Sequence, residues 1–231
     1  MKTPTPKTVM VTGAEGALGS VVARKFAASG SQVVATYFTS IPEELKNAPG
    51  FTWVQMNLSE STSVRDGIAQ AQAKVGEIES LVHCAGGFRY MAIDQVKDED
   101  LDFLLNANLR SSVLLLRELI PSMKKSKFGR VVLISSKATF SAPAGMGVYA
   151  ATKAGINMLV NSVAEEVREF DININAVAPT MIDTPANRRD MPTADFSKWV
   201  SREALAEIIF SLTQSWGQPI HGAVIPVAGR L

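Results

Sequence analysis

The sequence has few of the residues that define disulfide-rich or metal-binding proteins. Its 231 residues include one cysteine, Cys84, and two histidines. A single cysteine excludes an internal disulfide and is typical of a reducing compartment. Because there is no His-Glu-x-x-His motif and no cysteine cluster, we predict no metal site. We expect Cys84 to be a small buried hydrophobic residue and His83 to be a hydrogen-bonded residue of a strand.

An excess of charge of one sign is also absent. Charged residues make up 19% of the chain, and the formal net charge is +1. This balance provides neither a basic stripe for nucleic acid nor an acidic tail. No apolar run approaches the roughly 18 residues that span a bilayer, and the opening MKTPTPK lacks the apolar core of a signal peptide. We therefore expect a cytoplasmic protein whose partners are small molecules and copies of itself, not nucleic acid or membrane.

Short apolar segments rich in β-branched residues alternate with segments of helical period. Strands are predicted at residues 7–12, 32–37, 51–57, 80–87, 129–136, 171–179 and 222–227, and helices include 59–75, 98–123 and 201–214. Seven strands that alternate with helices predict an α/β fold, a doubly wound parallel sheet in one domain over residues 1–231. Residues 180–200 have no clear period, so we expect a long loop that serves as a lid over the ligand crevice.

The first predicted strand leads directly into a glycine-rich turn, TGAEGALG, and a helix. Gly13, Gly16 and Gly19 recur at three-residue intervals in this turn. Glycines at such a place allow the backbone to approach a pyrophosphate, whose charge is met by free N–H groups at the helix N-terminus. The pattern predicts dinucleotide binding, with a merely structural turn as the alternative.

The end of the second predicted strand bears on the choice of dinucleotide. In this fold an acidic residue there binds the adenosine ribose hydroxyls and favours NAD, whereas a nearby Arg favours the 2′-phosphate of NADP. The sequence has Tyr37 at this position, followed by Phe38, Thr39 and Ser40. The missing acid removes a repulsion against phosphate, so the sequence favours NADP over NAD, although no Arg is present.

Candidate catalytic residues follow the later strands. Tyr149 and Lys153 are spaced to share one helix face, and Ser136 ends the fifth predicted strand. A neighbouring ammonium is expected to lower the pKa of the Tyr149 phenol and make it a usable acid or base. Asn108 is a poor choice inside a helix, which suggests a locally distorted turn. The alternatives are a surface tyrosine near an unrelated lysine and a solvated amide.

These motifs together resemble the short-chain dehydrogenase/reductase family over essentially the whole chain. TGAEGALG resembles its cofactor loop, CAGG its Asn-Ala-Gly segment, and INAVAPTMIDT its segment after the sixth strand. Asn108, Ser136, Tyr149 and Lys153 match the order and spacing of its catalytic tetrad. The resemblance implies an NAD(P)-dependent oxidoreductase in which Tyr149 is the acid or base, together with assembly into a homotetramer or homodimer.

The resemblance also implies which residues hold the ligands. The implied cofactor-binding residues are Gly13, Gly16, Ala17, Leu18, Gly19, Tyr37, Asn57, Leu58, Ala85, Gly86, Tyr149, Lys153, Pro179, Ile182 and Thr184. Phe88 and Met146 are the implied substrate-binding residues, and no residue is implied to bind metal.

Within the family, the chain most resembles dihydropteridine reductases. The likeness rests on EGALGS, AGGF, PAGMGVY and the long lid sequence IDTPANRRDMPTADFSKW. Two departures matter: Tyr37 replaces the acid that gives those enzymes their NADH preference, and Ser136 is a serine that they commonly lack. The retained serine favours carbonyl or alcohol chemistry, with quinonoid dihydropterin reduction as the alternative. A third hypothesis is a nucleotide-sensing protein without turnover, against which the intact tetrad argues.

Overall fold

The computed structural model describes residues 5–231. Seven parallel strands form one sheet in the order β3-β2-β1-β4-β5-β6-β9. Their bounds are β1 Thr8–Thr12, β2 Gln32–Tyr37, β3 Phe51–Gln55, β4 Ser80–His83, β5 Phe128–Ile134, β6 Asp171–Pro179 and β9 Val224–Val227. The predicted doubly wound α/β fold is confirmed, and β2 and β6 have the predicted bounds.

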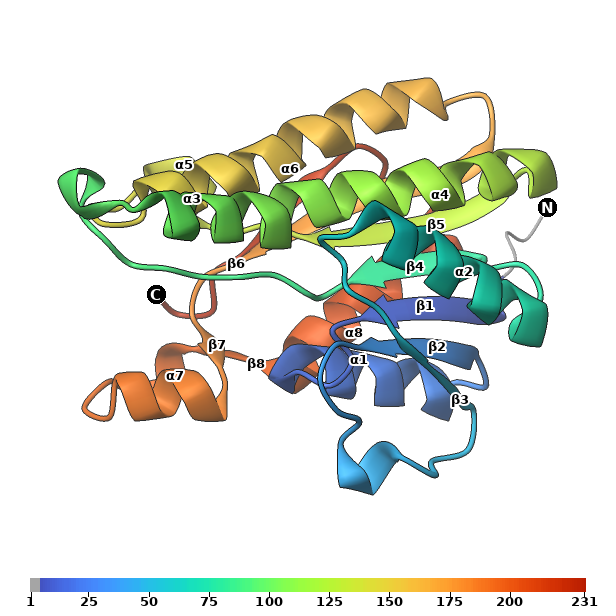
Figure 1. Cartoon of the computed structure of the whole chain (residues 1–231), viewed down its shortest axis with the longest axis horizontal. Helices are drawn as coiled ribbons and strands as arrows, with labels where there is room; N and C mark the ends of the chain where they lie inside the picture. The colour runs from blue at the N-terminus through green and yellow to red at the C-terminus, as the bar shows by residue number, and fades with distance from the viewer. Residues whose placement is uncertain (1–4) are drawn as a thin grey trace.

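Helices cover both faces of the sheet (Figure 1). On one face lie α2 Ser61–Val75, α4 Ser111–Ser126 and α6 Gly147–Glu166, and on the other lie α1 Ala17–Ala28 and α8 Arg202–Leu212. Shorter elements are η1 Glu43–Leu45, η2 Ile93–Gln95, α5 Ala138–Ser141 and η5 Ser215–Gly217. Each face has its own apolar core, because the central strands bury side chains on both sides of the sheet. No helix within residues 5–231 is both long and apolar enough to cross a bilayer.

The long helix predicted at 98–123 is interrupted. It begins as α3 Asp98–Leu104, widens into a π-helical turn, η3 Leu105–Arg110, and continues as α4. The hydroxyl of Ser112 donates to the Asn108 carbonyl at 2.7 Å, and that of Ser111 donates to the same carbonyl at 3.3 Å. Such back-bonding competes with the regular helical pattern, so the distorted turn expected around Asn108 is present.

Residues 180–200 are more ordered than the loop that the sequence predicts. They contain β7 Ile182–Asp183, α7 Pro185–Asp190, η4 Phe196–Lys198 and β8 Val200–Ser201, and β7 pairs with β8. The Thr184 hydroxyl caps α7 by accepting from the Asn187 amide at 3.1 Å, and Pro185 occupies the first helical turn. These elements span too few residues to produce a hydrophobic period. The expectation of a plain loop was therefore wrong.

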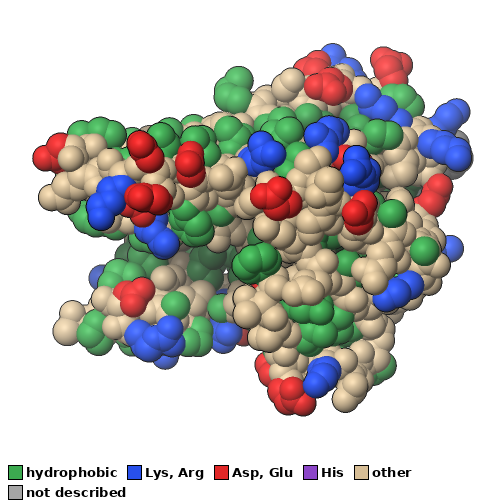
Figure 2. All heavy atoms as spheres, in the orientation of Figure 1, with side chains coloured by type: hydrophobic (Ala, Val, Ile, Leu, Met, Phe, Trp, Pro, Cys, Tyr) green, Lys and Arg blue, Asp and Glu red, His purple; other side chains and the backbone are tan. Residues whose placement is uncertain are grey.

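The carboxyl ends of the strands open toward a hollow in the molecule. In Figure 1 the arrows of β1 and β4 point toward the space between α3 and α7. Figure 2 shows this side hollowed between the segment that carries α3 and the one that carries α7. In open parallel sheets, ligands bind at this edge. The fold thus positions the candidate site at this hollow.

The packing of α4 on the sheet generates a stability prediction. Leu115 is fully buried, whereas Leu101 on α3 is 37% exposed. Leu115→Ala should lower the free energy of unfolding by about 3 kcal/mol, since it leaves a cavity in the core, and Leu101→Ala by less than about 1 kcal/mol. Urea denaturation measures both values. Equal losses would show that α4 does not pack as described.

Candidate active site

The turn between β1 and α1 brings bare backbone to the crevice. Gly13 has a φ of +63°, and a Cβ on Gly19 would lie 2.1 Å from the Gly13 carbonyl oxygen. Both positions therefore require glycine. The residue that precedes α1, Gly16, provides no side-chain cap for the first amides of the helix. Unpaired N–H groups at a helix N-terminus suit an anionic ligand, so this turn fits a dinucleotide pyrophosphate.

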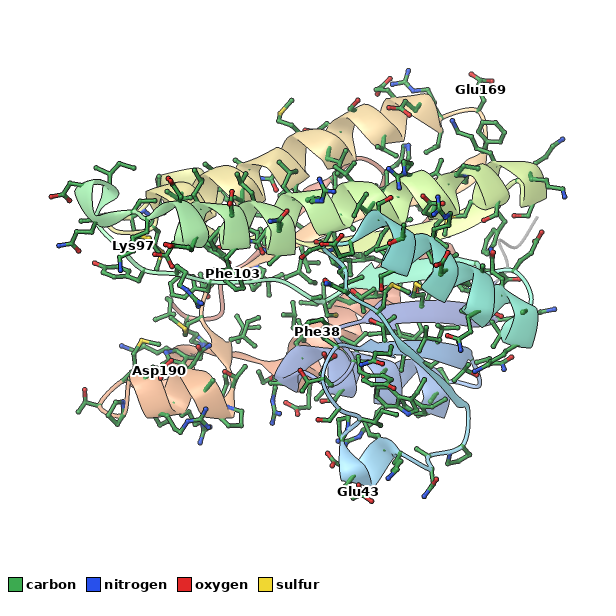
Figure 3. The ribbon with its side chains drawn as sticks, in the orientation of Figure 1. Phe38, Glu43, Lys97, Phe103, Glu169 and Asp190 are labelled. Carbon is green, nitrogen blue, oxygen red and sulfur yellow. The ribbon has the colours of Figure 1, made fainter. Side chains whose placement is uncertain are left out.

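A cavity of about 430 Å³ lies beside this turn. Its lining includes the predicted residues Gly13, Tyr37, Asn57, Leu58, Ala85 and Gly86, and also Glu15, Thr36, Phe38, Met56, Ser59, Phe103 and Ala107. Figure 3 labels Phe38 beyond the end of β2 and Phe103 on α3. Four predicted residues outside the lining belong to the glycine-rich turn or the start of α1: Gly16, Ala17, Leu18 and Gly19. The other predicted cofactor residues also lie outside it and are described below: Tyr149, Lys153, Pro179, Ile182 and Thr184. The cavity's apolar and aromatic walls fit an adenosine group.

Glu15 is the functional candidate that sequence reasoning missed. Its Oε1 accepts a hydrogen bond from the Phe38 amide at 2.9 Å, so its carboxylate reaches the end of β2. Tyr37 ends β2 as predicted, and this acid comes from the glycine-rich turn instead. The available signal was the position of Glu15 inside the glycine-rich turn, because that turn packs next to β2 in this fold.

Asn108 holds three parts of the site together. Its Oδ1 accepts from the Gly87 amide at 2.9 Å, and its Nδ2 donates to the Gly87 carbonyl and to Thr152 Oγ1, each at 3.0 Å. The side chain is fully buried. A Cβ on Gly86 would lie 2.9 Å from Asn108 Oδ1 and 3.2 Å from Lys153 Nζ, so a larger residue at this position would crowd both side chains.

Tyr149, Ser136 and Lys153 meet at the carboxyl end of β5. The Ser136 hydroxyl lies close enough to the Tyr149 hydroxyl to lower its pKa. Lys153, one helical turn later, donates from Nζ to the Ile134 carbonyl at 2.8 Å, and Nζ lies 5.9 Å from the centroid of the Tyr149 ring. The structure thus brings together all four residues of the predicted tetrad.

Burial dominates the electrostatics of these groups. It raises the pKa of Tyr149, and the nearby Ser136 side chain acts in the opposite direction. It also lowers the pKa of Lys153 to about 8. The pKa of Tyr149 is therefore not lowered as the sequence argument expected, because desolvation outweighs the influence of its neighbours. The phenol keeps its proton at neutral pH.

A hydrogen-bond chain that the sequence did not suggest supports Ser136. The preceding residue, Ser135, donates to Asn157 Oδ1 at 2.5 Å, and Asn157 Nδ2 donates to Thr139 Oγ1 at 3.0 Å. Thr139 in turn donates to the Ser136 carbonyl at 2.8 Å. These contacts join the end of β5 and α5 to α6, which fixes Ser136 relative to Tyr149.

The predicted substrate residues lie on the outer side of this group. The Phe88 ring meets Tyr149 edge-to-face, with centroids 4.9 Å apart. Met146 directly precedes α6 and is partly buried. A Cβ on Gly145, whose φ is +76°, would lie 2.5 Å from the Tyr90 ring, so the loops on both sides of the opening are packed together.

Pro179, Ile182 and Thr184 continue the site past β6. The Pro179 carbonyl accepts from the Lys137 amide at 2.9 Å, and the Ile182 carbonyl accepts from the Asn187 side chain at 2.7 Å. Because the Thr184 hydroxyl accepts its hydrogen bond from α7, its O–H proton is free to donate. None of the three lines the 430 Å³ cavity.

His83 is a buried, hydrogen-bonded strand residue, as predicted, whereas Cys84 lies just after β4 and is only partly buried. The two ring nitrogens of His83 are hydrogen-bonded to Thr12 Oγ1 at 2.6 Å and to Ser111 Oγ at 3.0 Å. Burial lowers the pKa of His83 to about 3 and raises that of the Cys84 thiol to about 12. His83 is therefore neutral and Cys84 is a thiol at pH 7. Within residues 5–231, no cluster of three or more His, Cys, Asp or Glu is placed to bind a metal.

The architecture defines the class of protein, and comparison with known proteins gives the family. A doubly wound parallel sheet with a glycine-rich turn after its first strand is the architecture of dinucleotide-binding proteins. The model of the short chain dehydrogenase family matches residues 7–195. The chain belongs to this family and is an oxidoreductase that uses a nicotinamide dinucleotide.

Several curated relatives share most of the chain's length. The 3-oxoacyl-[acyl-carrier-protein] reductase FabG of Thermotoga maritima is 27% identical over 97% of each chain. The Escherichia coli FabG is 31% identical over 79% of this chain and 76% of its own. Dehydrogenase/reductase SDR family member 6 of Rattus norvegicus is 30% identical over 85% of this chain and 82% of its own.

The buried His83 predicts a pH-dependent stability. Its pKa is about 3 in the folded protein against 6.5 ordinarily, so between these values the unfolded chain binds a proton that the folded protein does not. Stability should therefore fall as pH falls from 6.5 toward 3, by an amount on the order of 4 kcal/mol from this residue. In urea titrations from pH 4 to 7, His83→Gln should show a shallower pH slope than the wild type. Identical slopes would contradict the assignment.

Proposed function

We propose that the protein reduces a small carbonyl substrate with NAD(P)H and that Tyr149 donates the proton. One observation carries the proposal: the Tyr149 hydroxyl lies close to Ser136, and the buried Lys153 amine lies one helical turn away. A phenol, a hydroxyl and an ammonium at the carboxyl edge of a parallel sheet can polarise and protonate one carbonyl oxygen.

The bound nicotinamide would supply the hydride, and the protein would supply position and protons. The glycine-rich turn and the N-terminus of α1 would hold the pyrophosphate, and Lys153 the nicotinamide ribose. Ile182 and Thr184 would hold the carboxamide. The raised pKa of Tyr149 keeps its proton in place until the carbonyl oxygen becomes basic. This supports an acid in the direction of reduction.

Ser136 and Asn108 would assist the proton transfer. The Ser136 hydroxyl would donate to the substrate oxygen and stabilise its developing charge, which its fixed position beside Tyr149 supports. Asn108 would connect Lys153 to solvent water through the π-helical turn, so that the proton lost by Tyr149 is replaced. The buried Asn108 amide, which fixes Gly87 and α6, also positions Lys153.

Residues 180–200 would form a substrate lid in a single domain that spans the chain. Arg188 forms a two-point ion pair with Asp183, both contacts at 2.6 Å, and stacks over the Phe196 ring. Phe196 packs against Trp199 at 4.7 Å between centroids. The segment thus holds its own shape. Its aromatic side chains, together with the Phe88 ring beside Tyr149, favour a ring or an acyl chain over a sugar.

Two other functions remain as alternatives. The lid sequence IDTPANRRDMPTADFSKW supports quinonoid dihydropterin reduction, in which the substrate accepts hydride at an imine-like ring. A nucleotide sensor without turnover is disfavoured, because all four tetrad residues are present and lie together.

We also propose that the protein forms a homodimer or homotetramer through α4 and α6. Val113 on α4 and Met158 on α6 are exposed apolar residues, at 42% and 67%. A groove of about 420 Å³ between the two helices is lined mainly by apolar side chains, among them Leu116, Ile120 and Leu159. Apolar surface of this kind is typical of a contact between subunits.

Tyr149→Phe should impair carbonyl reduction while leaving coenzyme binding largely intact. The variant removes the proton donor and little volume, so carbonyl reduction should fall by about 10² to 10⁴-fold. The Kd for the coenzyme should change by less than about threefold, since the Tyr149 hydroxyl would be only one of many coenzyme contacts and the others are unchanged. Steady-state kinetics and isothermal titration measure the two quantities. Tyr90→Phe, at a residue 67% exposed, is the control. Full turnover in Tyr149→Phe would refute the acid assignment.

Ser136→Ala should distinguish the two reductase chemistries. If the substrate is a carbonyl, loss of the hydroxyl should lower kcat by about 10²-fold, because a hydrogen bond to the developing oxyanion is lost. Quinonoid dihydropterin reduction should be much less affected. Assaying both substrates with both enzymes measures the effect. Carbonyl reduction at the wild-type rate in Ser136→Ala would contradict the role of this hydroxyl, and pterin reduction much faster than carbonyl reduction by the wild type would favour the pterin assignment.

A further inference from the structure

The Glu15 carboxylate has one satisfied oxygen and one unsatisfied oxygen. Oε1 accepts from the Phe38 amide at 2.9 Å, whereas Oε2 is buried and has no hydrogen-bond partner among the described residues. Leaving a buried carboxylate oxygen without a donor is costly. Within a cavity that is built to receive a ligand, such an oxygen is placed to accept from that ligand.

The cavity around Glu15 has an asymmetric charge. Its lining residues include Tyr37, Phe38 and Asn57, and Glu15 is the one charged residue among them. Asn57 Oδ1 already accepts from the Ser59 amide at 3.1 Å, so Glu15 Oε2 is the acceptor left without a partner. No Lys or Arg lines this cavity in the part of the chain that the structure describes. The cavity is thus suited to hydroxyl donors and unsuited to an additional phosphate.

We infer that Glu15 selects the coenzyme: its carboxylate accepts hydrogen bonds from the adenosine ribose hydroxyls of NADH and repels the 2′-phosphate of NADPH. The inference rests on the proposed function only in requiring that the site binds a nicotinamide dinucleotide. It reverses the NADP preference that the missing acid at Tyr37 suggested. The acid is present, but it comes from the glycine-rich turn and not from the end of β2.

Glu15 discriminates between the two coenzymes mainly by repelling the 2′-phosphate of NADPH. A 2′-phosphate carries between one and two negative charges at neutral pH, and no cation lines the cavity to balance it. One arginine, Arg110, contacts a lining residue: its Nε donates to the Ser59 carbonyl at 3.0 Å. Arg110 is exposed and does not line the cavity. Its contribution to NADPH binding can be tested separately.

Isothermal titration of the full-length protein with NADH and NADPH tests the assignment without relying on turnover. The wild type should bind NADH at least about tenfold more tightly than NADPH, from repulsion between close charges. Glu15→Gln should bring the two Kd values to within about threefold, mainly through tighter NADPH binding, because the charge is removed. The glutamine oxygen can still accept from the Phe38 amide, so the turn should keep its structure, which circular dichroism would verify.

Glu43→Gln is the matched control, because it removes one acidic charge from η1, in the connection between β2 and β3, outside the cavity. Its ratio of Kd values should equal that of the wild type. Raising the ionic strength should narrow the wild-type ratio and leave that of Glu15→Gln unchanged.

Four results would overturn the inference. NADPH binding as tight as NADH binding in the wild type, or an unchanged ratio in Glu15→Gln, would contradict the role of Glu15 and leave the proposed function standing. Preferred NADPH binding that is lost in Arg110→Gln would assign selectivity to that arginine instead. Failure of both dinucleotides to bind would contradict the inference and the proposed function together.

Discussion

The hydrogen bonds of one buried amide hold the candidate site together. Asn108 bonds both backbone groups of Gly87 and the hydroxyl of Thr152, so it ties a π-helical turn to the end of β4 and to α6. Because an unsatisfied amide in this position would be costly, the three elements are held in one arrangement. That arrangement positions Lys153 and Tyr149 on α6 relative to the glycine-rich approach to the crevice. The proposed chemistry therefore depends on contacts between residues that lie 21 and 44 positions apart in the sequence.

Burial has a uniform effect on the ionisable groups around this contact. Tyr149, Lys153, His83 and Cys84 all have pKa values shifted toward their neutral forms, with desolvation as the largest cause. For Tyr149 this favours a protonated phenol, which suits an acid better than a base at neutral pH. For Lys153, a pKa of about 8 leaves the ammonium largely charged at pH 7 and sensitive to small changes in its surroundings. Burial thus keeps the proton on Tyr149 and makes the charge of Lys153 responsive to its surroundings.

The two halves of the site differ in how they are built. In the proposed site, the catalytic half would use Tyr149 and Lys153 on α6 and Ser136 just after β5, whereas the coenzyme half would use the backbone of the glycine-rich turn and the Glu15 carboxylate, which reaches the residue after β2. Residues 180–200, the proposed lid, hold their shape through their own contacts, including the Arg188 pair with Asp183. Such self-contained segments can be exchanged in evolution without disturbing the sheet, which explains how one fold serves many substrates.

The sequence by itself determined the elements whose signals are local. Buried strands such as 32–37 and 171–179, the glycine-rich turn, the shared face of Tyr149 and Lys153, and the distortion at Asn108 all follow from short-range residue patterns and steric rules. Only the tertiary structure decided the rest. The order in residues 180–200 depends on a two-residue strand pair and a capped helix too short to show a period. The rise in the pKa of Tyr149 depends on burial, and the reach of Glu15 to Phe38 joins residues that are 23 positions apart. Contacts of this kind are set by how the sheet brings strand ends together, and no local pattern encodes their distances.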